Sequence, residues 1–209
     1  MRIFKKIQDQ SRKKKFELFM RTFNPTEITS ILDVGCGEGN FLELMYPFKK
    51  SITCIDISEK NIEKFKKLHP NIKIMQGNAK DMPFEDNSFD IVFSNAVIEH
   101  VGDINEQKKF AKEISRVGRN YFITTPNKFF PLEPHYRFPF FQFIPKKLQK
   151  ILTNHFSIGN YPKGYWEDIN LLSSNQLKEL FPESKIVKHR ITFYPETLIA
   201  ISNSKKGMK

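Results

Sequence analysis

The chain has 209 residues, of which 39% are hydrophobic and 27% are charged, and its formal net charge is +11. This length fits one domain with an appended lobe better than two independent domains. No apolar run approaches the roughly 18 residues of a membrane-spanning helix, so we expect no such helix. Two cysteines, Cys36 and Cys54, are too few for a disulfide scaffold. No Cys/His cluster has the spacing of a zinc site, and we expect reduced thiols.

The positive charge lies at both ends of the chain. The net charge is +6 over residues 1–24, −2 over 25–126, +3 over 127–170 and +4 over 171–209. A basic surface favours anionic partners such as nucleic acid, phosphorylated small molecules or anionic lipid, and a merely solvated surface is the alternative. Because the first 23 residues lack the apolar stretch of a secretory signal, we expect a cytoplasmic protein.

The first two-thirds of the chain alternates between strand and helix patterns. Residues 1–23 are expected to form a basic amphipathic helix that ends at Asn24-Pro25. Beyond it we predict strands over residues 30–34, 51–55, 72–76, 89–94 and 120–124, and helices over 40–45, 59–68 and 105–116. Such alternation indicates βαβ units and a parallel sheet with helices on both faces. The predicted fold class is therefore α/β.

The pattern changes after Pro126. Residues 127–170 combine several prolines with eleven aromatic residues, which predicts a lid packed on the end of the sheet. Ser173 and Gln176 then predict the capping box of a helix. Two strands, 185–191 and 196–202, should pair antiparallel at the sheet edge. We expect one domain made of a basic helix (1–24), a core (25–126), the lid (127–170) and a C-terminal helix with two strands (171–209).

The strongest local signal is a glycine-rich turn in ILDVGCGEGN, residues 31–40. Glycines let the backbone approach a ligand closely and adopt positive φ. A nicotinamide-cofactor fingerprint would read G-x-G-x-x-G, whereas this turn reads G-x-G-x-G. Asp33, which precedes the turn, would repel a phosphate and suits a ligand with a cationic amine.

Two further polar residues follow the next two predicted strands. Asp56, in CIDIS (54–58), can accept hydrogen bonds from both hydroxyls of a ribose. Asn78 and Ala79 follow the third strand, where a short polar side chain and a backbone N–H can read an adenine edge. Ligands of open α/β sheets bind at the carboxyl ends of the strands, so we predict one nucleoside site there.

These motifs resemble those of the class I S-adenosylmethionine-dependent methyltransferases, and more closely the small-molecule group called type 11. The resemblance covers residues 28–125. It rests on LDVGCGEGNF (32–41), CIDIS (54–58), GNAKDMPFEDNSFDIVFSNAVIEHV (77–101) and YFITTPN (121–127). It implies S-adenosylmethionine as the cofactor and a Rossmann-like seven-stranded sheet, mostly parallel, whose last two strands form an antiparallel hairpin.

The resemblance also assigns roles to single residues. Asp33, Gly35 and Gly37 would face the methionine part of the cofactor, and Asp56 would hold the ribose hydroxyls. Asn78 and Ala79 would read adenine, and Asn95 would line the pocket beside the transferred methyl. Cys36 and Ile57 are further candidates for cofactor binding, and we interpret Cys36 as a small neutral filler between the glycines and not as a nucleophile. The family usually has Asp where Asn78 stands, and an Asn can still accept a hydrogen bond from the adenine amino group.

The sulfonium methyl is already electrophilic, so the protein mainly aligns an acceptor and excludes water. A hydroxyl acceptor would also benefit from a base, and His100 and His135 are the candidates. The alternatives are a loop-positioning role for His100 and a polar cap on the lid for His135. Some ubiquinone-pathway relatives bind a divalent metal through Glu-x-x-Glu-His; Ala96 replaces the first Glu here, and we predict no metal.

We predict a methyltransferase that acts on a small-molecule, saccharide or lipid-linked acceptor by O-methylation, and the basic ends are compatible with an anionic acceptor. TPNKFFPLEPH (125–135) looks like variants from methyltransferases of cell-surface saccharide assembly. One alternative is an RNA methyltransferase, although residues 94–97 lack the Asn/Asp-Pro-Pro-aromatic motif of base amino-group methylation. Another is a non-catalytic partner subunit, or an anchor whose N-terminal helix contacts an anionic membrane. The oligomeric state is left open.

Overall fold

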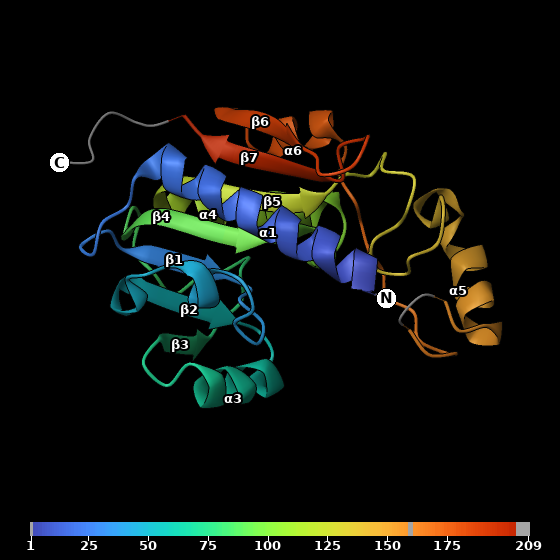
Figure 1. The fold of residues 1–209 in the computed structure, drawn as a ribbon, viewed down its shortest axis with the longest axis horizontal. Helices are drawn as coiled ribbons and strands as arrows, with labels where there is room; N and C mark the ends of the chain where they lie inside the picture. The colour runs from blue at the N-terminus through green and yellow to red at the C-terminus, as the bar shows by residue number, and fades with distance from the viewer. Residues whose placement is uncertain (1, 159–160, 204–209) are drawn as a thin grey trace.

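The computed structural model describes residues 2–158 and 161–203, and within them seven strands form one sheet with the order β3-β2-β1-β4-β5-β7-β6 (Figure 1). The strands are β1 (Ile31–Val34), β2 (Ile52–Asp56), β3 (Lys73–Gln76), β4 (Phe89–Asn95), β5 (Gly118–Pro126), β6 (Ser184–His189) and β7 (Thr197–Ser202). Strands β1 to β5 run parallel, whereas β7 runs antiparallel to both β5 and β6. The predicted α/β fold with its C-terminal antiparallel hairpin is confirmed.

Helices surround this sheet. They are α1 (Arg2–Phe23), α2 (Leu42–Met45), α3 (Glu59–Leu68), α4 (Ile104–Val117), α5 (Lys146–His155) and α6 (Ser174–Leu180), with single 3₁₀ turns η1 (Lys49–Ser51), η2 (Ile98–His100) and η3 (Phe141–Phe143). The side chains of Ser58, Asp103 and Ser173 accept hydrogen bonds from first-turn backbone N–H groups of α3, α4 and α6. At Ser173 the predicted capping box is complete.

Consecutive residues of the central strands point to opposite faces of the sheet, and each face has its own hydrophobic core. In β5, Phe122 packs with residues of α1, α2 and α3, while Ile123 packs with residues of α4 and α6. Figure 1 shows α1 crossing the front of the sheet, with α4 behind it. Covering both faces explains why these strands are nearly continuous apolar runs.

The basic N-terminal helix is part of the core. Phe19 of α1 is fully buried, and its ring lies 5.5 Å from that of Phe93 and 5.6 Å from that of Phe122. The N-terminal end of α1 lies near the edge of the sheet where β1 to β5 end (Figure 1). The sequence-predicted helix is thus confirmed over its described residues, and Met1 lies outside them.

Residues 127–158 and 161–170 form a lobe beside that edge of the sheet. The lobe contains α5, a helix that the sequence analysis did not predict, and a small apolar cluster around Tyr136, Phe141 and Ile158. Several of its aromatic side chains are exposed, among them Phe129 and Phe140. Among the described residues, no helix is long and apolar enough to cross a membrane.

Candidate active site

The glycine-rich turn follows β1 directly and has a conformation that requires glycine. Gly35 has φ of 72° and Gly37 has φ of 61°, values that side chains disfavour. A Cβ at Gly35 would also lie 2.5 Å from Cγ2 of Val97. The backbone N–H of Gly35 donates to the carbonyl of Ile55 over 2.8 Å, which ties the turn to β2.

Asp56, at the end of β2, lies against this turn. Its Oδ2 accepts a hydrogen bond from the N–H of Gly37 over 2.8 Å, and its Oδ1 accepts one from the N–H of Ser58 over 2.9 Å. Oδ1 also accepts a hydrogen bond from Asn61 Nδ2 over 3.3 Å, and since a carboxylate has about four lone-pair sites, the remaining capacity lies on Oδ2. The buried carboxylate is therefore fixed by three donors of the protein, with capacity left on Oδ2 for a hydroxyl group.

A cavity of about 480 Å³, here called the glycine cavity, opens beside Asp56. Its lining brings together seven of the residues predicted from the sequence: Gly35, Gly37, Asp56, Ile57, Asn78, Ala79 and His100. A Cβ at Gly37 would meet no atom within 4 Å, so the turn leaves space beside it for a ligand.

Asp33 and Cys36 line a different, smaller cavity of about 80 Å³, here called the acid cavity, which shares Gly35 with the glycine cavity. Glu43 of α2 also lines it, and both Asp33 and Glu43 are almost fully buried. Burial and the neighbouring Glu43 carboxylate raise the pKa of Asp33 well above its ordinary value. Arg12 of α1 reaches the same cavity.

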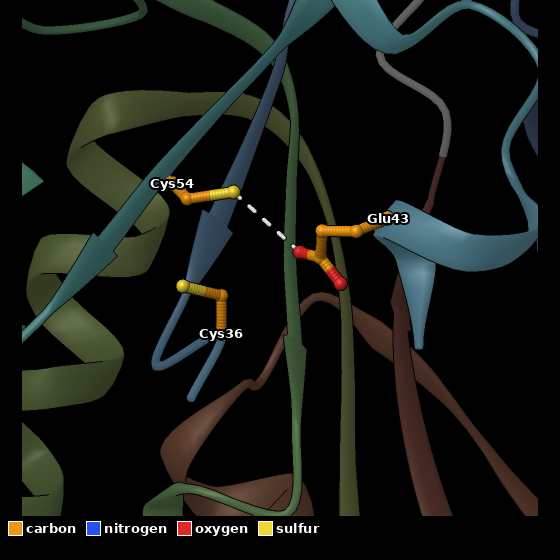
Figure 2. A group of neighbouring side chains, drawn as sticks. All are labelled: Cys36, Glu43 and Cys54. Atoms are coloured by element: carbon orange, nitrogen blue, oxygen red, sulfur yellow. Dashed lines mark hydrogen bonds between the residues drawn. The ribbon is translucent and has the colours of Figure 1, made fainter. Parts of the chain in front are cut away.

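The two cysteines lie near Glu43 (Figure 2), and Cys36 and Glu43 line the acid cavity. The Sγ of Cys54 donates to Oε1 of Glu43 over 3.5 Å, and both cysteines are free thiols. A hydrogen bond with Cys36 and burial raise the pKa of the Cys54 thiol. Cys36 therefore turns its side chain toward Cys54 and the acid cavity, away from the lining of the glycine cavity.

A third cavity of about 360 Å³, here called the lobe cavity, lies between α1, the ends of β4 and β5, and the lobe. Asn95 and His135 line it, and Ala96 lines both this cavity and the glycine cavity. Asn95 Oδ1 accepts hydrogen bonds from Lys15 Nζ over 2.9 Å and from Thr124 Oγ1 over 2.8 Å. Asn95 thus lies on the lobe cavity and the acid cavity, but not on the glycine cavity.

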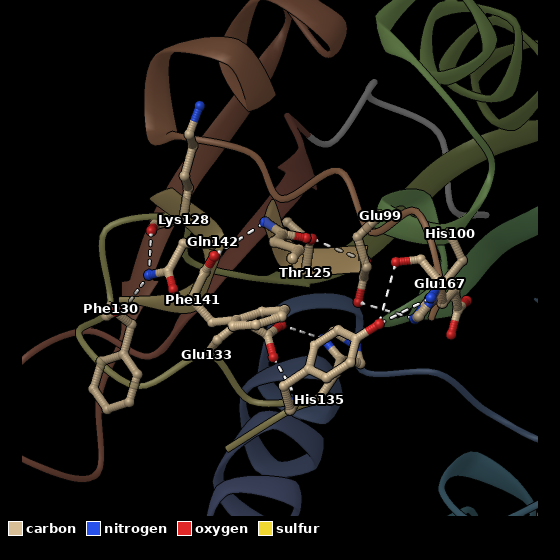
Figure 3. Close-up of polar contacts among 12 residues, drawn as sticks. Glu99, His100, Thr125, Lys128, Phe130, Glu133, His135, Phe141, Gln142 and Glu167 are labelled. Atoms are coloured by element: carbon tan, nitrogen blue, oxygen red, sulfur yellow. Dashed lines mark hydrogen bonds and ion pairs between the residues drawn. The ribbon is translucent and has the colours of Figure 1, made fainter. Parts of the chain in front are cut away.

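Both candidate histidines are oriented by carboxylates at the boundary of these cavities (Figure 3). His100 Nδ1 lies 2.6 Å from Oε1 of Glu167, and His135 Nδ1 lies 2.7 Å from Oε1 of Glu133. The two imidazole rings are 4.9 Å apart, edge to face. With each Nδ1 donating to its carboxylate, each Nε2 can accept a proton.

Glu99 lies next to the two histidines and is fully buried. Its Oε2 accepts a hydrogen bond from Thr125 Oγ1 over 3.0 Å, while its Oε1 has no hydrogen-bond partner and lies 4.0 Å from His100 Nε2. Burial raises the pKa of Glu99 above its ordinary value, against the opposing effects of the two histidines. Burial alone would lower the pKa of His100, but its hydrogen bond to Glu167 and the nearby carboxylates give a net rise.

Two groups of side chains in the described ranges have metal-ligand chemistry. The ligand atoms of Cys36, Glu43 and Cys54 lie within 4.8 Å of one another, and so do those of Glu99, His100 and His135. The sequence analysis expected no metal, and that expectation stays a prediction.

Four polar residues around the cavities escaped the sequence analysis: Arg12, Lys15, Glu43 and Glu167. Arg12 and Lys15 lie with Gln8 and Ser11 on one face of α1, all lining the lobe cavity. Polar residues at this i, i+3, i+4, i+7 spacing were the available signal, although the same spacing is common on solvated helix faces. Glu43 and Glu167 carry no comparable signal, because their neighbours are set by the tertiary fold.

The sheet order, the glycine turn and the acidic residue after β2 define a Rossmann-like methyltransferase fold. Residues 32–121 match the family model described as a methyltransferase domain. A probable S-adenosylmethionine-dependent methyltransferase of Mycobacterium tuberculosis is 32% identical over 101 residues, which are 47% of this chain and 36% of that protein. A ubiquinone biosynthesis O-methyltransferase of Pelagibacter ubique is 34% identical over 107 residues, 50% of this chain and 45% of that one.

Solved structures share the fold. A protein of Pyrococcus horikoshii superposes with a TM-score of 0.66 at 20% identity, covering 94% of this chain and 91% of that chain. The magnesium protoporphyrin IX methyltransferase of Synechocystis, solved with bound SAH, gives a TM-score of 0.60 at 14% identity and covers 94% and 83%. Residues 32–121 thus resemble S-adenosylmethionine-dependent methyltransferases in sequence, and the chain shares its fold with such enzymes. The matched segments span less than half the length of the curated relatives.

Proposed function

We propose that this protein binds S-adenosylmethionine in the glycine and acid cavities and methylates an oxygen atom of a small-molecule acceptor held in the lobe cavity. The observation that carries the proposal is that Ala96 lines both the glycine cavity and the lobe cavity. Ligands in the two cavities would therefore lie next to the same residue. When bound, S-adenosylmethionine supplies an electrophilic methyl group on a sulfonium sulfur.

The residues present fit this cofactor. Asp56 can accept hydrogen bonds from the ribose hydroxyls, and Asn78 and Ala79 lie in the same cavity for the adenine. Asp33 and Glu43 are buried carboxylates that make no ion pair with a cation among the described residues. An ammonium group would compensate these buried acids. The amino group of a methionine moiety has this chemistry.

His135 is the residue we assign to proton removal from the acceptor. It lines the lobe cavity, and the buried Glu133 holds its Nδ1, which leaves Nε2 to accept a proton from a hydroxyl. His100 lines the glycine cavity instead and is paired with Glu167, which suits a role in positioning this wall. The O-methyltransferase name of a curated relative supports an oxygen acceptor. A saccharide or lipid-linked acceptor, to which the resemblance of residues 125–135 points, is the alternative to a free small molecule.

The test is calorimetric titration of S-adenosylmethionine, its demethylated product and NAD into the wild type and Asp56→Ala. We expect the two sulfur compounds to bind and NAD not to bind. Loss of the charged acceptor in Asp56→Ala should cost about 2 kcal/mol of binding free energy. Glu63→Gln on the exposed side of α3 is the matched control and should bind as the wild type does. Failure of both sulfur compounds to bind would overturn the proposal.

A further inference from the structure

The N-terminal helix supplies one wall of the lobe cavity. Gln8, Ser11, Arg12 and Lys15 of α1 all line this cavity, and their spacing places them on one helix face. The opposite wall comes from the lobe and includes apolar residues such as Phe130 and Leu132. His135 and Arg137 of the lobe and Glu196 also line the cavity. The cavity therefore combines the cationic side chains of α1 with apolar and polar side chains on the lobe side.

Lys15 is the deepest of these cations. Only 8% of the residue is exposed, although it carries an ammonium group. Its Nζ donates one hydrogen bond, to Asn95 Oδ1 over 2.9 Å, and lies 5.3 Å from the centre of the Phe41 ring. An ammonium has three N–H donors, so this environment leaves part of its hydrogen-bonding capacity unused.

The charges around Lys15 do not neutralise it. Among the described residues it forms no ion pair with a carboxylate. Arg12 adds a second positive charge, whereas Glu99 and Glu196 are the acids whose charges favour the ammonium. Burial, followed by Arg12, lowers the pKa of Lys15 to about 8. Lys15 in turn contributes to the lowered pKa of His189, behind burial.

A purely structural role would not need a buried charge here. Thr124 Oγ1 already donates to the same oxygen of Asn95 over 2.8 Å. A buried ammonium without a counter-ion costs free energy, and a ligand anion in the lobe cavity would remove that cost. Arg12 on the same helix face would add a second donor group to such an anion.

We propose that Lys15, assisted by Arg12, binds an oxyanion group of the methyl acceptor, so that the acceptor is a small organic anion with an apolar body. The group is a carboxylate or a phosphate monoester, since either offers several acceptor oxygens to an ammonium. The inference rests on the proposed function for its acceptor role. It assigns the basic N-terminal helix to substrate recognition.

The experiment measures binding without requiring turnover. Benzoate, phenyl phosphate and benzyl alcohol are titrated calorimetrically into the wild type, Lys15→Met and Lys13→Met, with and without the demethylated cofactor product. Lys13 is exposed on the same helix and is the matched control. In parallel, NMR of protein labelled with ¹³C at lysine Cε follows the pKa of Lys15, whose signal is the one missing from Lys15→Met.

We expect at least one anion to bind the wild type about tenfold or more tightly than benzyl alcohol, because a charge-assisted hydrogen bond replaces an unpaired ammonium. Lys15→Met should remove this preference, and Lys13→Met should keep it. The anion should raise the pKa of Lys15 from about 8. Preference for benzoate or for phenyl phosphate identifies the oxyanion as carboxylate or phosphate.

Equal binding of all three probes, or equal losses in both lysine variants, would overturn the inference. An unshifted Lys15 signal at a saturating anion concentration would also overturn it. Titration with the demethylated cofactor product alone distinguishes failure of this inference from failure of the proposed function. If that product binds and the anions show no preference, only the oxyanion site fails; if it does not bind, the methyltransferase proposal fails.

Discussion

At the scale of single residues, His100 is the clearest pH-dependent group. Its pKa is raised above the ordinary value of 6.5, because the hydrogen bond to Glu167 and the nearby carboxylates outweigh burial. We expect Glu167→Gln to lower the pKa of His100, since the variant loses the charge of the hydrogen-bond partner. Two-dimensional NMR of the imidazole nitrogens across a pH titration measures this change. An unchanged pKa in the variant would contradict the geometry.

The pair of His100 and Glu167 also predicts the pH range in which it stabilises the fold most. A raised histidine pKa stabilises the fold fully below the unfolded value of 6.5, and this contribution is lost as pH rises through the folded pKa. The pKa of Glu167 is lowered, mainly by its hydrogen bond to His100, so its contribution is lost as pH falls below its ordinary value of 4.5. The free energy of unfolding of the wild type should therefore exceed that of Glu167→Gln by the largest amount between pH 4.5 and pH 6.5.

The sequence could identify residues whose role depends on local backbone. Gly35 and Asp56 were predictable because a glycine turn after one strand and an acid after the next meet at one sheet edge. Lys15 could not be predicted, because its burial depends on the packing of α1 against β4. Its partner Asn95, at the end of β4, lies 80 positions further along the chain. The sequence motif also could not predict that Asn95 lies outside the lining of the glycine cavity.

At the scale of elements, α1 is expected to stabilise the whole sheet. Phe19→Ala should lower the free energy of unfolding by about 3–5 kcal/mol, because it removes a fully buried ring from the core on one face. Urea denaturation followed by far-ultraviolet circular dichroism measures this loss. Lys13→Ala on the exposed face is the control and should change stability by less than about 0.5 kcal/mol. A Phe19→Ala variant as stable as the wild type would show that α1 is a peripheral attachment.

The elements of the core could be predicted because each carries its own local signal. Apolar runs marked β1 to β5, and Asp103 and Ser173 marked helix starts that the structure shows. The helix α5 was missed because prolines and aromatic residues surround it, and its one fully buried residue, Thr153, is not apolar. Its apolar residues Leu148 and Ile151 are exposed, whereas Leu152 packs against the apolar cluster of the lobe.

At the scale of the whole molecule, the sheet and the lobe have separate apolar clusters of unequal size. Trp166, the single tryptophan, lies in the lobe, so its fluorescence reports on the lobe while circular dichroism reports mainly on the rest. We expect the fluorescence transition to occur at a lower urea concentration, because the smaller cluster gives lower local stability. Coincident transitions would show that lobe and sheet unfold as one unit.

The position of α1 also has a consequence for how the chain matures on the ribosome. This helix is synthesised before the residues it packs on, because Phe19 contacts Tyr46, Phe93 and Phe122. The apolar face of α1 therefore stays exposed to solvent until β5 has left the ribosomal exit tunnel. The strand ends that carry Asp33 and Asp56 can meet before then, whereas Lys15 reaches Asn95 only after α1 has docked. Until it docks, the nascent chain exposes an amphipathic basic helix on which a chaperone or a membrane surface could act.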